Sequence, residues 1–189
     1  MSTRPAHILS RRGLSTALGP IALTICTPAA NANERDWDRA SSIARDALVV
    51  VAVGLPAVKG DWNGSLQAAG SIGATAGVTW ALKETFPETR PDGSDRKSFP
   101  SGHTSVAFAA ASSLAERQGW DVGIPAHLAA AFVGFARVKA DKHHWYDAVA
   151  GAAIGEAAGL LITRKPRQNM AVIPWGDSRG GGVSFAMRF

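Results

Sequence analysis

Apolar and polar positions follow one another along this chain in long blocks. After the polar segment "NERDWDRASSIARD", five stretches rich in Ala, Gly and Val run between short breaks that contain charged residues, Pro or Gly. Small side chains at this density favour closely packed helices, so the pattern predicts an all-α fold, a helical bundle of about five to six helices. A chain of 189 residues buries a sizeable core as one domain. The expected helices are 37–58, 64–85, 102–117, 122–137 and 145–163.

A charged segment, "PETRPDGSDRKSFP", joins the second and third predicted helices. Pro87, Pro91 and Gly93 end the helix before it. Ser101, in "PSGHTS", is suited to cap the helix after it. A loop of this length in a compact domain is more often a lid or a binding loop than filler, so we expect it to border a functional site.

The two ends of the chain differ from the middle. The first 32 residues carry three arginines and no acid, then the apolar run "GLSTALGPIALTICTPAA" and a small-residue cleavage site, which predicts a signal peptide, 1–32. "SRRGL" also resembles a twin-arginine signal, so both export routes stay open. The helical domain is expected at 33–167. In the tail, 168–189, apolar residues alternate with others after the turn "GDSRGGG", which predicts a short C-terminal β-hairpin that packs on the helices or makes a peripheral contact.

Charge and cysteine content exclude several classes of protein. The single cysteine, Cys26, lies in the signal segment, so no disulfide stabilises the mature chain. Without its leader the chain has 17 basic and 15 acidic residues, and no basic tract suggests nucleic acid as a partner. No particular oligomeric state is predicted.

Membrane spanning is the other question that the apolar runs raise. A span needs about 20 mostly apolar residues, and the mean hydropathy of the chain is only +0.01. We therefore expect an exported, periplasmic or periplasm-facing domain, soluble or associated with the membrane surface, rather than an integral membrane protein. The residues that interrupt the runs are Lys59, Lys83, Glu116, Arg137, Asp147 and Glu156.

Three short segments carry candidate chemistry: "KETFPETRP", "PSGH" and "RVKADKHHWYD". Taken singly, each cation can be a residue that complements a helix dipole or a solvated loop charge, and "PSGH" can be a helix cap. Taken together, Lys83, Arg90 and Arg137, with the backbone N–H groups of Ser101 and Gly102 at a helix start, form a receptor for a tetrahedral anion.

The same segments supply groups for catalysis. His143 and Asp147 are four residues apart, which on a helix places them on one face and within reach of each other. A carboxylate that holds one ring nitrogen leaves the other as a lone-pair donor. His144 is also spaced to meet Asp147, so spacing alone does not choose between the two histidines. His103 is placed to supply the proton that a leaving oxygen needs.

In order and spacing these motifs resemble the signature of the type 2 phosphatidic acid phosphatases, which share a helical fold with bacterial class A acid phosphatases and vanadium haloperoxidases. That signature is Lys, six residues, Arg-Pro; then Pro-Ser-Gly-His; then Ser-Arg, five residues, His, three residues, Asp. The one departure is Ala136, where the signature has Ser. The resemblance covers about residues 40–163, and the matching positions are Lys83, Arg90-Pro91, Pro100 to His103, Arg137, His143 and Asp147.

The resemblance implies a metal-independent phosphatase with a phosphohistidine intermediate. By the matching positions His143 is the nucleophile, Asp147 orients it, and His103 is the general acid and then the base. The cations and the two amides would hold the phosphate oxygens, with no metal and no cofactor.

The substrate stays open among lipid phosphates, isoprenoid pyrophosphates and small phosphomonoesters. Two alternatives also stay open. One is a haloperoxidase that uses vanadate as its cofactor, where a phosphatase would instead be inhibited by vanadate. The other is a non-catalytic anion-binding envelope protein.

Overall fold

The computed structural model describes residues 33–164, 170–177 and 180–187, so the predicted signal peptide and the boundary at 167 lie outside the described residues. The predicted all-α fold is confirmed. Each predicted helix is present in this part of the chain, with ends within three residues of those expected. The elements are α1 (Glu34–Val58), α2 (Trp62–Thr85), α3 (Gly102–Gln118), α4 (Trp120–Lys139), α5 (Trp145–Ile162), β1 (Met170–Asp177) and β2 (Gly180–Met187).

Local signals explain the helix ends. Asn33 caps α1, because its side-chain oxygen accepts from the Asp36 N–H at 3.0 Å and the Asp36 carboxylate accepts from the Asn33 N–H at 3.3 Å. Asp61 starts α2 by accepting from the Gly64 N–H at 3.0 Å. Gly119 separates α3 from α4 with a φ of 89°, a left-handed conformation that favours glycine.

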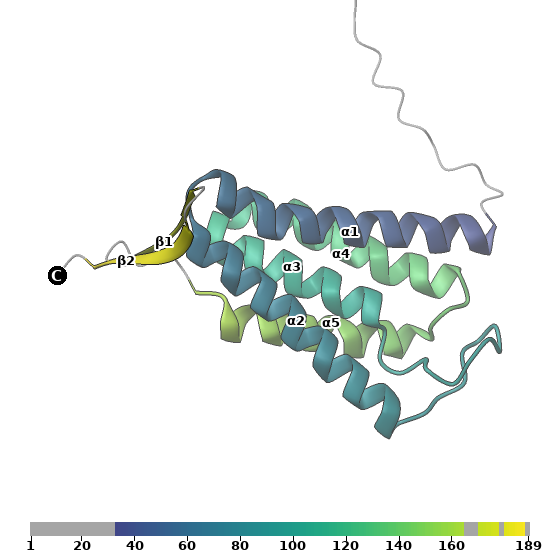
Figure 1. The fold of residues 1–189 in the computed structure, drawn as a ribbon. Helices are drawn as coiled ribbons and strands as arrows, with labels where there is room; N and C mark the ends of the chain where they lie inside the picture. Colours follow the sequence, from purple (N-terminus) through teal and green to yellow (C-terminus); the bar gives the residue numbers. More distant parts are fainter. Residues whose placement is uncertain (1–32, 165–169, 178–179, 188–189) are drawn as a thin grey trace, which may run out of the picture. The chain divides into compact units, whose positions relative to one another are not determined.

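α3 is the central helix and contacts each of the other four (Figure 1). Most of its buried residues are Ala, Ser or Thr. α5 packs on it through glycines: a Cβ on Gly151 would lie 2.5 Å from the Ser101 carbonyl oxygen, and one on Gly155 would lie 2.1 Å from that of Ser105. The two backbones are therefore too close for any larger residue, as the small-residue composition predicted.

The predicted C-terminal hairpin is confirmed. β1 and β2 pair antiparallel, from Met170 opposite Met187 to Asp177 opposite Gly180. Trp175 contacts Gly182 across the pair, since a Cβ on that glycine would lie 3.1 Å from the indole ring.

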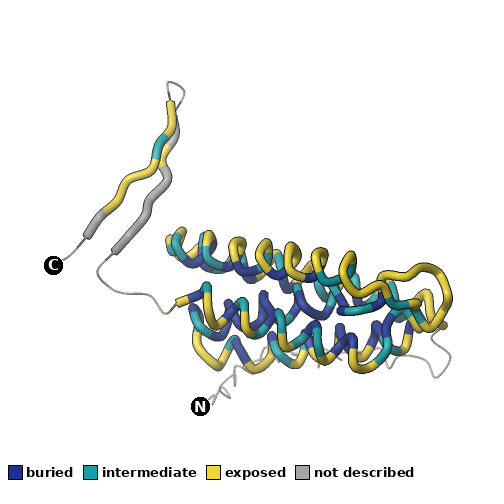
Figure 2. Tube along the Cα trace, turned by 90° about the horizontal axis from the view of Figure 1, so that it is seen from below, coloured by how far each residue is buried: buried dark blue, intermediate teal, exposed yellow. Residues whose placement is uncertain are grey.

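Large apolar side chains are exposed on the outward side of the bundle. Figure 2 shows, for the outer helices, buried positions on the side that faces the neighbouring helices and exposed positions on the opposite side, whereas α3 has no exposed residue. Two helices of the described part, α1 and α4, are long and apolar enough to cross a membrane. The large exposed side chains include Leu66, Val78 and Trp80 on α2, Ile124, Leu128, Phe132 and Phe135 on α4, and Val149, Leu160 and Leu161 on α5.

Candidate active site

One end of the bundle gathers all the candidate chemistry. Five parts of the chain lie at this end (Figure 1): the start of α1, the end of α2, the segment 86–101, the start of α3, and the stretch from the end of α4 to the start of α5. Segments that are far apart in sequence thereby become neighbours. All eight residues that the sequence singled out lie on them: Lys83, Arg90, Ser101, Gly102, His103, Arg137, His143 and Asp147.

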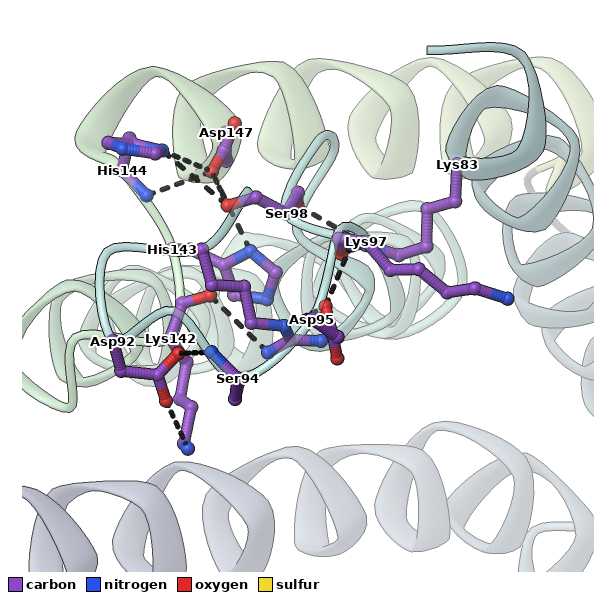
Figure 3. A network of polar contacts seen from close by, with 11 residues as sticks. Lys83, Asp92, Ser94, Asp95, Lys97, Ser98, Lys142, His143, His144 and Asp147 are labelled. Atoms are coloured by element: carbon purple, nitrogen blue, oxygen red, sulfur yellow. Dashed lines mark hydrogen bonds and ion pairs between the residues drawn. The ribbon is translucent and has the colours of Figure 1, made fainter. Parts of the chain in front are cut away.

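His143 and Asp147 are buried side by side, with 2% and 0% of their side chains exposed. His143 Nδ1 lies 3.7 Å from Asp147 Oδ2, which is longer than a hydrogen bond. The same oxygen accepts from Ser98 Oγ at 2.6 Å and from the His144 N–H at 2.8 Å (Figure 3). His143 Nδ1 and Asp147 Oδ1 are buried without a hydrogen-bond partner in the described part of the chain.

The structure corrects one part of the spacing argument. α5 begins at Trp145 and His144 is its N-cap residue in extended conformation, so His143 precedes the helix. His143 and Asp147 therefore meet at a helix start and not along a helical face. His144 Nδ1 is closer to the carboxylate, at 3.3 Å, and the contacts of Asp147 complete a capping box for α5.

Burial and charge keep His143 neutral. Its pKa lies well below the ordinary value, first because the ring is buried and then because Arg137, Lys83 and Arg90 are close. A neutral imidazole has a lone pair available for attack. His143 thus meets the electronic requirement for a nucleophile, and its position among cations suits an anionic reaction partner.

Two of these cations are held by the segment 86–101. Lys83 Nζ donates to the carbonyl oxygens of Lys97 and Ser98 at 2.6 and 3.2 Å. Its burial and the nearby Arg90 lower its pKa to about 8. Arg90 Nε pairs with Asp95 Oδ1 at 2.7 Å, which aims the guanidinium toward the connection between α4 and α5.

The third cation, Arg137 at the end of α4, is 95% enclosed by the protein. Its Nη1 donates to Asp38 of α1, an ion pair that joins the two helices. Its Nε is buried and has no hydrogen-bond partner among the described residues. A buried guanidinium N–H without an acceptor is unfavourable, and a phosphoryl oxygen of a bound ligand would accept its hydrogen bond.

The start of α3 departs from the prediction in two ways. Ser101 is the N-cap residue, but its hydroxyl pairs with Thr104 Oγ1 at 2.9 Å and makes no cap. Its backbone N–H donates to the Asp147 carbonyl oxygen at 3.0 Å and is not free for a ligand. The Gly102 N–H makes no hydrogen bond within the described residues, so of the two predicted amide donors Gly102 is the one available.

The segment 86–101 is tied down across the site. The Asp92 N–H donates to the Asp141 carbonyl at 3.1 Å. Lys142 Nζ pairs with Asp92 Oδ2 at 2.6 Å (Figure 3). Tyr146, at the start of α5, donates a hydrogen bond from its hydroxyl to the Glu88 carboxylate. These contacts attach the segment to the connection between α4 and α5, so it borders the site as the loop length predicted.

His103 meets a helix that sequence reasoning had left out of the site. Its Nε2 lies 2.9 Å from Arg45 Nη1 and 3.1 Å from Ser42 Oγ, both on α1. Its burial, and then the charges of Arg137 and Arg45, lower its pKa to about 3. A signal was available: Asp38, Ser42 and Arg45 are spaced to share one face of the first predicted helix. Ser98, the other residue missed, has no such pattern.

One set of metal-ligand types occurs in the described part of the chain. Donor atoms of Glu88, His144 and Asp147 lie within 4.8 Å of one another. They are already in use, since Glu88 accepts from Tyr146 and Asp147 accepts from Ser98. Nothing in this group calls for an ion, and metal independence stays a prediction.

Comparison with known proteins points to one family. The family profile described as the PAP2 superfamily matches residues 79–171, which include all eight candidate residues. A curated relative, lipid A 1-phosphatase of Porphyromonas gingivalis, is 36% identical over 89 residues. That match covers 45% of this chain and 20% of the relative, so the chain spans about a fifth of the relative's length.

Two solved structures share the fold. LpxE of Aquifex aeolicus has a TM-score of 0.59 at 20% identity, over 68% of this chain and 83% of that one. A transmembrane PAP2-type phosphatidylglycerolphosphate phosphatase of Bacillus subtilis has a TM-score of 0.56 at 22% identity, over 68% and 74%. At these identities the likeness concerns the fold alone.

Proposed function

The chain belongs to the PAP2 superfamily, and from that premise we propose that it is a lipid phosphatase that works through a phosphohistidine on His143. One observation carries the proposal: His143, buried and with its pKa lowered by that burial, lies among three cations at the end of the bundle where a second histidine, His103, lies in the first turn of α3. Binding an anion requires only the cations. The two histidines and Asp147 add what a hydrolytic reaction needs.

In the proposed reaction the His143 lone pair attacks phosphorus, an N–P bond forms, and the P–O bond to the leaving group breaks. His103 supplies the proton that the leaving oxygen takes up. Water then attacks the phosphohistidine while His103 accepts a proton, and inorganic phosphate leaves. The cations stabilise charge on the phosphoryl oxygens, where catalysis of phosphoryl transfer is concentrated.

Each cation has a distinct part in holding the phosphoryl group. The Nε of Arg137, which has no partner in the part of the chain that the structure describes, supplies a buried donor. Arg90 and Lys83 border the site from the segment 86–101 and from α2. The Gly102 N–H adds a donor at the positive end of α3. Asp147 lies 3.7 Å from His143, so its charge favours the cationic ring of the phosphohistidine, and the contact can tighten when substrate binds.

We further propose that the bundle is embedded in a membrane. The 21 residues from Trp62 to Leu82 on α2 carry no charge, and a helix of that length is about 32 Å long, close to the thickness of the hydrocarbon layer. On α4 no acidic or basic residue other than His127 lies between Val122 and Ala136. An apolar surface this extensive is favourable against lipid and unfavourable in water.

This proposal replaces the sequence-based expectation of a soluble or surface-bound domain. Three of the charges that interrupt the apolar runs along the chain are buried or paired between helices once the bundle packs. Arg137 and Asp147 are buried at the site, and Glu156 pairs with His127 between α4 and α5. Aromatic residues border the apolar zone on both sides, as interfacial belts do: Trp80, Trp145 and Tyr146 near the site, and Trp62 and Trp120 at the opposite end.

The site lies at the end of the bundle, outside the apolar zone. The predicted signal peptide indicates which side of the membrane the site faces. Cleavage of a signal peptide leaves the new N-terminus on the outer side of the inner membrane. α1 begins at the site end of the bundle. The candidate site would therefore face the periplasm.

A groove next to the site suits a lipid chain. A cavity of about 330 Å³ forms a groove bordered by α3, α4 and α5, and its lining is almost wholly apolar. Thr104, Val138 and Trp145 line it, and each directly follows a residue at the site end of the bundle, namely His103, Arg137 and His144. A phosphate held at His143 can thus leave its apolar chain in this groove, which favours lipid phosphates over small phosphomonoesters.

Phosphate release by the purified mature chain in detergent tests the proposal. We expect faster hydrolysis of a long-chain lipid phosphate than of a short soluble phosphomonoester. His143→Ala should lower kcat by about 10³-fold or more, whereas His144→Ala, the matched neighbour, should keep a substantial fraction. Rapid quench with labelled substrate should trap phosphate on His143. Equal losses in the two variants would contradict the assignment of the nucleophile, and no release from any ester would contradict the function.

A further inference from the structure

Two side chains of α1 converge on a single atom of His103. Arg45 Nη1 lies 2.9 Å from Nε2 and Ser42 Oγ lies 3.1 Å from the same nitrogen. Both residues precede the region that matches the family profile, which begins at residue 79. The contact therefore comes from a part of this chain outside the three motifs.

The chemistry of the contact determines the state of the ring. A guanidinium can only donate, so Nε2 must offer its lone pair and the ring proton must be on Nδ1. A protonated Nε2 would direct its hydrogen at a hydrogen of Arg45, so that contact and a cationic His103 exclude each other. Ser42 is compatible with both states, because a hydroxyl donates to a lone pair and accepts from an N–H.

We propose that Arg45 is a positioning residue that holds His103 neutral in the resting enzyme and releases it when the phosphate of the substrate arrives. The inference rests on the proposed function, in which His103 must carry a proton to the leaving oxygen. While Arg45 occupies Nε2, His103 cannot carry a proton there. Release therefore couples proton transfer to the presence of substrate.

The surroundings of Arg45 allow this movement. Its side chain is 27% exposed, and within the described part of the chain its other donors, Nε and Nη2, meet only Asp46 Oδ1, at 2.9 and 2.7 Å. Asp46 is on the same helix and is 63% exposed, so it holds Arg45 from the solvent side. The guanidinium is thus anchored at one edge and can swing at the other.

The charges around His103 explain why a phosphate would trigger the change. Burial is the largest cause that lowers the pKa of His103; two positive groups lower it further and two carboxylates raise it. A phosphoryl dianion brings negative charge to the positive groups and offers Arg45 a bidentate partner better than a ring nitrogen. The groups that face His103 are Arg45, Asp38 and Asp46 on α1 and Arg137 on α4.

Long-range ¹H–¹⁵N NMR on the histidine-labelled mature chain in detergent reads the ring directly. The mature chain has four histidines, and His103→Asn assigns the signal. In the wild type we expect neutral His103 with its proton on Nδ1 at pH 5 to 7 (about the usual titration range of histidine). Arg45→Met should raise the pKa of His103 by about one unit, a tenfold change in proton affinity. Arg45→Gln provides the same loss of charge if the Met variant does not fold.

Two controls sharpen the measurement. Arg39→Met removes an exposed arginine from the same helix and should leave the His103 titration unchanged. Saturating inorganic phosphate should raise the pKa of His103 in the wild type by more than in Arg45→Met. A proton on Nε2 in the unliganded wild type, or the same pKa with and without Arg45, would overturn the proposal.

Kinetics separate a positioning role from a structural one. In Arg45→Met the alkaline limb of the kcat/KM profile should move about one unit to higher pH, because His103 keeps its proton longer. A uniform loss at every pH with an unmoved limb would instead mean that Arg45 only supports the fold. The NMR result does not depend on turnover, so a wild type that releases no phosphate would sink the proposed function without deciding the role of Arg45.

Discussion

α5 packs so closely on α3 that Gly155→Ala tests whether this packing stabilises the fold and positions the site residues. The new Cβ would lie 2.1 Å from the Ser105 carbonyl oxygen, 2.8 Å from the Ala109 nitrogen and 2.9 Å from Phe108 Cβ. Real Cβ contacts are essentially never shorter than 3.0 Å, so the helices must separate by close to 0.9 Å, the difference between 3.0 and 2.1 Å. Two of the three obstacles are backbone atoms of a central helix and cannot turn away.

The energetic cost follows from this displacement. Overpacking of a tight core costs about 1–3 kcal/mol, and the better helix propensity of Ala returns about 1 kcal/mol. Because two of the obstacles are backbone atoms, the cost lies in the upper part of that range, about 2–3 kcal/mol. We therefore expect a net loss of about 1–2 kcal/mol in the free energy of unfolding, or a Tm lower by about 2–8 °C. The displacement also moves His103 on α3 away from His143 ahead of α5, and a misplacement of about 1 Å can cost up to about 100-fold in rate.

Thermal unfolding in detergent and phosphate release measure the two effects. Gly73→Ala on α2 is the matched control, since nothing lies within 4 Å of its added Cβ. That variant should be as stable as the wild type or more stable, with full activity. If Gly155→Ala left Tm and the rate of phosphate release unchanged, as expected for Gly73→Ala, α3 and α5 could not approach each other this closely.

Three further predictions concern chemistry, pH and place. Phosphate release should continue in EDTA and be inhibited by vanadate, a mimic of the five-coordinate phosphorus; strict dependence on a divalent ion would contradict the role of the cations. Folding lowers the pKa of His143, and that of His103 to about 3. The unfolded chain binds these protons near about pH 6.5, so stability should be complete above that pH and fall below it by up to about 1.4 kcal/mol per pH unit and group. A wild-type Tm that does not change between about pH 7 and about pH 4.5 would count against the buried neutral histidines. His103→Gln should reduce the slope of Tm against pH. The protein should remain in the membrane fraction through carbonate and leave it with detergent; release by carbonate would refute the embedded bundle.

Local information in the sequence determined most of the fold. Helix ends follow from nearby signals such as Asn33, Gly119 and Pro87, whose effects act over a few residues and need no tertiary contact. The eight candidate residues could also be selected from the sequence, because each occurs in a short motif with fixed spacing. The structure then places all of them at one end of the bundle, where α2, α3 and the connection from α4 to α5 meet.

Tertiary packing decided what each of these groups touches. Ser101 belongs to the right motif, yet its N–H is taken by the Asp147 carbonyl, a partner 46 residues away. The contact between Arg45 and His103 spans 58 residues and depends on how α1 crosses α3.

Tertiary packing also decided which residues face outward from the bundle. Glu156 interrupts an apolar run of the linear sequence, but once the helices pack it is half-buried and pairs with His127 of α4. Periodicity and motifs report a helix and its residue types, whereas hydrogen-bond partners and the outward face depend on the rotation and crossing of whole helices, which only the packed bundle fixes.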